Sequence, residues 1–125
     1  FRSGEAAIKP EMIPIIERVV NVLSACTGDV LVSGYTDDRP ISSDRYRSNW
    51  DLSAARAVSV VHELVMNRQV PAERVVAAGR AETNPLAPND TPENRALNRR
   101  VEIAIRNPEC NDEVPTGDLP VEIMP

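Results

Sequence analysis

The sequence has few aromatic residues and no long hydrophobic run. Phe, Tyr and Trp make up 3% of its 125 residues, yet the hydrophobic fraction is 42%. We therefore expect one compact domain with an aliphatic core. No apolar stretch approaches the ~20 residues that a helix needs to cross a bilayer. No signal peptide is recognisable and the first residue is Phe1, so we expect a processed protein or a fragment.

Basic charge is not concentrated anywhere in the chain. The net charge is −5, and the segment 107–125 holds five acidic and no basic residues. The remaining 14 acidic residues (19 − 5) balance the 14 Lys and Arg. A nucleic-acid-binding domain carries a basic patch, so we expect no nucleic-acid partner.

Histidine and cysteine are also scarce. His62 is the only histidine; it has no nucleophile or metal ligand near it in sequence, and we interpret it as a solvated helix residue. Cys26 and Cys110 match no zinc spacing and are either free thiols or one disulfide. We expect no metal, no cofactor and no enzyme; a pair of catalytic carboxylates is the one arrangement that inspection leaves open.

Hydrophobic periodicity predicts three helices. Apolar residues at helical spacing mark residues 10–25 and 52–67. Ser48 is the expected N-cap of the second helix, and Thr91 with Pro92 starts a short third one. The buried face predicted for the second helix consists of Ala54, Ala57, Val58, Val61, Leu64 and Val65.

Strands alternate with these helices. Residues 30–32 and 75–79 are predicted as buried strands, and the period-two alternation of 101–105 predicts a half-exposed strand. This order predicts an α/β sandwich, that is, a mixed β-sheet with helices packed on one face. Residues 107–125 contain four prolines, and we expect them to form an irregular tail.

Three segments carry a more specific signal. They are residues 34–38 (Gly-Tyr-Thr-Asp-Asp), 48–57 (Ser-Asn-Trp-Asp-Leu-Ser-Ala-Ala-Arg-Ala) and 89–103. In this order and spacing they resemble the OmpA C-terminal-like family, which includes MotB and the peptidoglycan-associated lipoprotein. The resemblance covers residues 1–106. The long insertion 39–47 and the Ser-Asn-Trp run look most like the MotB-like subgroup, although anchoring domains of type VI secretion share them.

The resemblance implies the OmpA C-terminal-like fold, with its first strand upstream of Phe1. It also implies non-catalytic binding of peptidoglycan through diaminopimelate in the peptide stem. Asp37 and Arg56 match the family's ligand-binding aspartate and arginine. The free end of diaminopimelate carries an ammonium and a carboxylate, and an Arg fork meets a carboxylate with two parallel hydrogen bonds. Further ligand-binding candidates are Thr36, Asn49, Leu52, Asn98, Arg99 and Arg100.

Each of these residues also has a structural interpretation. Asp37 can cap a turn, and Arg56 can form a surface ion pair with Glu63 or Asp51. Of Arg99 and Arg100, we expect one to brace the loop around Asp37 or contact the ligand, and the other to face solvent. Trp50 is interpreted as a core plug or loop anchor in preference to a sugar-stacking platform.

Tyr35 departs from the family pattern, which usually has His at this position. A phenol retains a hydrogen-bonding tip but does not become positively charged near neutral pH.

The expected role is to anchor an inner-membrane complex, a flagellar stator, to the cell wall from the periplasm. The expected partners are peptidoglycan, a second copy of the chain and a membrane tether supplied upstream. The alternatives are a type VI secretion cell-wall anchor and a dimerisation module without ligand affinity. If the strands next to Cys26 and Cys110 run antiparallel, the two sulfurs meet, and the oxidising periplasm favours a disulfide.

Overall fold

The computed structural model describes residues 1–106, 108–110 and 119–124. The helices predicted at 10–25, 52–67 and after Thr91 are confirmed. Ser48 and Thr91 accept backbone N–H bonds at the helix starts, as N-caps do. The helical elements are η1 (Pro10–Met12), α1 (Ile13–Ala25), α2 (Asn49–His62), the π-helical turn η2 (Glu63–Asn67), η3 (Ala72–Arg74) and α3 (Pro92–Asn98).

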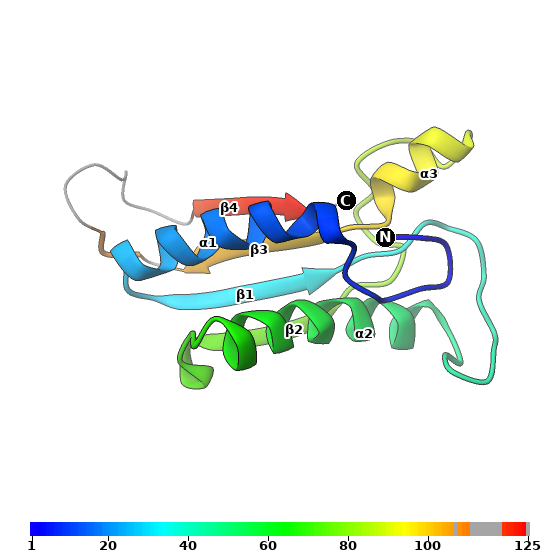
Figure 1. The fold of residues 1–125 in the computed structure, drawn as a ribbon. Helices are drawn as coiled ribbons and strands as arrows, with labels where there is room; N and C mark the ends of the chain where they lie inside the picture. The colour runs from blue at the N-terminus through cyan, green and yellow to red at the C-terminus, as the bar shows by residue number, and fades with distance from the viewer. Residues whose placement is uncertain (107, 111–118, 125) are drawn as a thin grey trace.

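Four strands form one mixed sheet in the described part of the chain, in the order β2-β1-β3-β4 (Figure 1). The strands are β1 (Asp29–Gly34), β2 (Val75–Gly79), β3 (Val101–Arg106) and β4 (Leu119–Met124). β1 pairs parallel with β2 and antiparallel with β3, and β3 pairs antiparallel with β4. This confirms the predicted mixed sheet.

The hydrophobic core lies between the helices and one face of the sheet. Alternate residues of a strand point to the same face, so Val30 and Val32 lie beside Ile105 and Ile103, with which they pair. All four are at most 1% exposed and belong to one cluster with the buried stripes of α1 and α2. The predicted packing of helices on one face is therefore confirmed. No helix in the described residues is long and apolar enough to cross a membrane.

Three details differ from the sequence expectations. Residues 75–79 are not a buried strand, because β2 lies at an edge of the sheet and Val76 is 52% exposed. Val58 is exposed on α2, because the polar residues Ser53 and Arg56 occupy the buried face instead. The tail is not irregular throughout, because Leu119–Met124 forms β4. The expectation for residues 111–118 lies outside the described residues.

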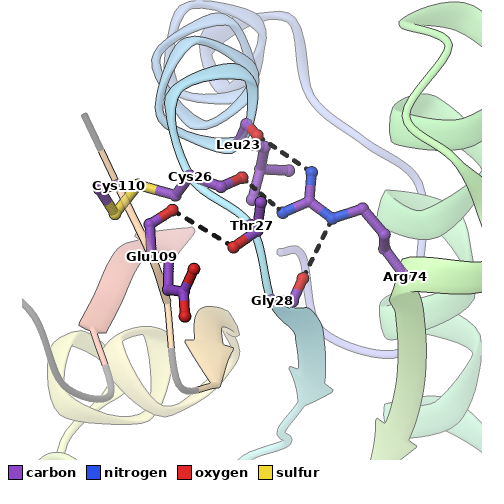
Figure 2. The surroundings of a disulfide bond; sticks show 7 residues. All are labelled: Leu23, Cys26, Thr27, Gly28, Arg74, Glu109 and Cys110. Carbon is purple, nitrogen blue, oxygen red and sulfur yellow. Dashed lines mark hydrogen bonds between the residues drawn. A yellow bond between two sulfur atoms is a disulfide. The ribbon is translucent and has the colours of Figure 1, made fainter.

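A disulfide joins Cys26 and Cys110 at the end of the sheet opposite α3 (Figures 1 and 2). β1 and β3 are antiparallel, so the segment that precedes β1 lies next to the segment that follows β3. This places Cys26 beside Cys110. Arg74 reinforces this end: its guanidinium donates to the carbonyls of Leu23, Cys26 and Gly28 at 2.9–3.0 Å. The bonds to Leu23 and Cys26 satisfy carbonyls that the end of α1 leaves without helical partners.

Two glycines set the position of α2 over the sheet. Gly34 and Gly79 are paired in register at the ends of β1 and β2. A Cβ at Gly34 would lie 2.0 Å from the carbonyl oxygen of Ser53, and one at Gly79 would lie 2.8 Å from the backbone nitrogen of Ala54. The helix backbone thus approaches both strands at a distance that only glycine permits. This contact holds the first half of α2 beside the residues that follow β1.

Candidate functional site

A cavity of about 160 Å³ lies at the α3 end of the sheet. Figure 1 shows that the N-terminal segment and the long loop after β1 meet at this end. Six of the eight predicted ligand-binding residues line the cavity: Thr36, Asp37, Asn49, Leu52, Arg56 and Arg99. The fold therefore brings together residues from the loop after β1, from α2 and from the segment between α3 and β3.

Asp37 supplies the negative charge of the cavity and is only 5% exposed. Its Oδ2 accepts a hydrogen bond from Nη1 of Arg99 at 2.9 Å, and its Oδ1 accepts one from the backbone N–H of Arg39 at 3.0 Å. The bond from the Arg39 N–H is the turn cap that the structural interpretation of Asp37 predicted. Asp37 therefore caps a turn and also lines the cavity. A carboxylate has about four acceptor sites, which leaves capacity for a ligand donor.

Arg56 is fully buried and is bound by backbone oxygens. Its Nε donates to the carbonyl of Glu5, Nη1 to that of Tyr35 and Nη2 to that of Arg2, at 2.8–3.0 Å. A guanidinium has five N–H groups, so two remain for a ligand. The predicted alternative, an ion pair with Glu63 or Asp51, is wrong: those carboxylates pair with Arg68 and Arg47.

Burial lowers the pKa of Arg56 to about 10, and the positive charge of Arg99 acts in the same direction, whereas Asp37 opposes both. At neutral pH the guanidinium therefore stays protonated. The cavity holds the cations of Arg39, Arg56 and Arg99 and the single anion of Asp37. Such a lining favours a ligand that presents a carboxylate together with a smaller amount of positive charge.

The remaining predicted residues in the cavity shape its walls. Thr36 is anchored by its backbone N–H to the carbonyl of Ala81 at 2.9 Å. Leu52 is 3% exposed and packs in a small apolar cluster. The Asn49 amide donates to the carbonyl of Arg39 and to the carboxylate of Glu82. The bond to Arg39 ties the loop after β1 to the start of α2.

Asn98 and Arg100 do not line this cavity, so the structure does not bring them together with the other six predicted residues. Asn98 is fully buried, and its amide makes four bonds to the loop at residues 86–89. Arg100 does not face solvent either, because it is fully buried. Its guanidinium carbon lies 3.9 Å from the centre of the Tyr35 ring, and it bonds Glu102 and the carbonyl of Asn84.

This stacking gives a physical reason for the tyrosine. A phenol ring attracts a guanidinium through its negative face. A protonated histidine at the same place would repel it. Tyr35 is 4% exposed and is not among the residues that line the cavity.

Trp50 is not a core plug, because it is 56% exposed at the start of α2. It borders a shallow depression with Asp38 and Glu82, next to the cavity. Sequence reasoning also missed five residues of the cavity lining: Ser3, Gly4, Arg39, Pro40 and Ile41. No residue type or spacing marked these five residues in the sequence. The only indication was their position in the N-terminal segment and in the long insertion, which flank the family motif.

Comparisons with known proteins show the family of the chain. Residues 1–99 match the model of the OmpA family. The chain is 39% identical over 106 residues to Motility protein B of Bacillus subtilis, covering 84% of the chain and 41% of that protein. It is 37% identical over 106 residues to the peptidoglycan-binding protein ArfA of Mycobacterium tuberculosis, covering 84% of the chain and 31% of that protein.

Among solved structures, the cell wall anchor of the type VI secretion system of Pseudomonas aeruginosa superposes with a TM-score of 0.73 at 44% sequence identity. The match covers 84% of this chain and 73% of that one. The chain spans less than half the length of Motility protein B and of ArfA, so the part that it matches in each is a domain. Sequence, fold and site residues lead to one conclusion: this chain belongs to the OmpA family.

Proposed function

We propose that this domain binds peptidoglycan without catalysis, through the diaminopimelate of the peptide stem. The observation that carries the proposal is that Asp37, Arg56 and Arg99 line one cavity, with one anion set against two cations. The ammonium of the ligand meets the free acceptor sites of Asp37. Its carboxylate meets the two unused N–H groups of Arg56 and the guanidinium of Arg99. The name of the ArfA relative supports the choice of polymer.

A binding role is also favoured by the chemistry of the cavity lining. Among the described residues, Asp37 is the only acidic one that lines the cavity, and it is bound to Arg99. Cleavage of a glycosidic bond requires two carboxylates on either side of that bond. The described part of the lining therefore supplies recognition groups and no second carboxylate for acid–base chemistry.

In the cell, we place the domain in the periplasm, where it holds an inner-membrane complex against the wall. The disulfide supports this location, since such bonds persist in oxidising compartments. Similarity to Motility protein B favours a flagellar stator, and similarity to the type VI secretion cell wall anchor favours a secretion system. We also propose that two copies pair, which light scattering on the purified domain tests directly.

Co-sedimentation with purified sacculi tests the binding proposal. Asp37→Asn removes the charge but keeps an oxygen that can accept the Arg39 N–H. It should raise the apparent Kd for sacculi at least about tenfold, the loss expected for one charge-assisted contact. Asp44→Asn is the matched control, because Asp44 lies exposed in the same loop and outside the cavity. Equal binding by parent and Asp37→Asn would refute the assignment.

The ligand class is tested by competition. Soluble stem peptides with diaminopimelate should displace the domain from sacculi, whereas the same peptides with lysine should displace it poorly. Lysine lacks the distal carboxylate, so the remaining N–H groups of Arg56 and Arg99 would gain no acceptor from the ligand. Equal displacement by both peptides would indicate recognition of the glycan or of charge alone.

A further inference from the structure

A second cavity, of about 210 Å³, adjoins the first on the side of α3. The two cavities share four lining residues: Ser3, Asp37, Arg39 and Arg99. Pro92 and Arg95 of α3 close the second cavity. Because they share a wall, one extended ligand can occupy both cavities at once.

The second cavity carries an excess of positive charge. Three arginines line it, Arg39, Arg95 and Arg99, against the single carboxylate of Asp37. Both Asp37 oxygens already accept bonds, one from the Arg99 guanidinium and one from the Arg39 backbone. Asp37 therefore offsets the charge of Arg99, and the exposed Asp38 offsets that of Arg95 only through an ion pair at 3.9 Å. Among the described residues, the guanidinium of Arg39 has no such partner.

Arg95 brings an incompletely bonded guanidinium to this cavity. Its Nε is buried and has no hydrogen-bond partner among the described residues. The carboxylate oxygen of Asp38 lies 3.9 Å from this Nε, which is beyond hydrogen-bond distance, and the Asp38 side chain is 53% exposed. A buried N–H without an acceptor costs free energy, so this position favours an oxygen ligand. The exposed guanidinium of Arg39, which the described residues leave without an ion pair, stands on the same cavity wall.

We propose that the second cavity binds a further carboxylate of the same stem peptide. The proposal rests on the function proposed above. The distal end of diaminopimelate carries one ammonium and one carboxylate and so has no net charge, which leaves the arginine excess unmatched. A stem tetrapeptide has two more carboxylates: the α-carboxylate of its γ-linked D-glutamate and the C-terminal carboxylate of D-alanine. Either one supplies the planar pair of acceptors that a guanidinium binds best.

Three synthetic peptides distinguish these sources. The first is L-Ala-γ-D-Glu-diaminopimelate-D-Ala, the second has the glutamate α-carboxylate as an amide, and the third has the C-terminal carboxylate as an amide. Calorimetric titration of the parent domain should show that one of the two amides binds at least about tenfold more weakly than the free acid. The weakened amide identifies the carboxylate.

Arg95→Gln should reduce the difference in affinity between the free acid and that amide to about threefold or less, because one of the guanidiniums that bind the carboxylate is gone. Arg106→Gln, which removes one exposed charge at the opposite end of β3, should keep the tenfold difference. Arg39→Gln changes an exposed side chain and should reduce the difference, which keeps the proposal testable if Arg95→Gln does not fold.

Two results would overturn the proposal: equal binding of all three peptides by the parent, or an unchanged difference in Arg95→Gln and Arg39→Gln. Failure of the diaminopimelate assignment gives a different result. In that case, replacing diaminopimelate by lysine in the free-acid peptide would leave the affinity of the parent domain unchanged, irrespective of how strongly the two amide peptides bind.

Discussion

Replacing Arg56 by glutamine should destabilise the fold as well as weaken the proposed ligand binding. The guanidinium is fully buried and bonds three backbone carbonyls, two of which belong to the N-terminal segment. Glutamine is shorter and neutral, so it reaches at most one of these oxygens and leaves the others buried without a donor. Hydrogen bonds to charged groups contribute ~1.5–3 kcal/mol each, and bonds that share one side chain do not add fully. We expect a loss of about 3–5 kcal/mol.

Urea denaturation followed by circular dichroism measures this loss. With a slope of about 1.5 kcal/mol per molar urea, the midpoint should fall by roughly 2 M or more. Arg106→Gln should stay within about 0.5 kcal/mol of the parent, because its side chain is exposed. An unchanged midpoint for Arg56→Gln would show that the three bonds do not hold the segment, and Arg56 would then be a ligand residue alone.

Three further perturbations follow from the same contacts. Gly34→Ala should lower stability by about 1–3 kcal/mol in the urea assay, because α2 must move away from β1; an unchanged midpoint would contradict the close approach. Dithiothreitol should destabilise the parent by up to about 4–5 kcal/mol through the loop closed by Cys26 and Cys110, and a double Ser variant should not respond. Tyr35→His should lose stability as pH falls from 8 to 5: the Arg100 cation keeps the buried imidazole neutral, so the unfolded state takes up more protons. A variant with the pH profile of the parent would contradict this.

The fold could be predicted in its outline because hydrophobic spacing and capping residues agreed. Helix α2 was the clearest case, with Ser48 at its start. Its buried face was misjudged at Val58 because periodicity counts apolar residues only, whereas the structure buries Arg56 there through backbone oxygens. β4 was missed because Pro120 argues against a strand, although proline is tolerated in an edge strand such as this one.

The candidate site could be predicted only as far as the family motif reaches. Asp37, Arg56 and Arg99 fall in that motif and line one cavity. Asn98 and Arg100 fall in the motif too, but the chain uses them to hold the loop before α3. The sequence could not separate the residues that line the cavity from those that hold the loop. The difference depends on the direction in which each side chain leaves the backbone.

The candidate site and the framework of this end of the domain share the same arginines. Arg56 and Arg99 both donate to carbonyls of the N-terminal segment: Arg56 to Arg2 and Glu5, and Arg99 to Phe1. Ser3 and Gly4, which lie between these carbonyls, line the cavity. The side chains that would meet a carboxylate are therefore held in place before a ligand arrives. Their rotamer entropy is lost on folding and not on binding, which favours affinity in a small, open site. A lysine ammonium, which lacks the planar fork, could not hold the segment and still direct N–H groups to a ligand.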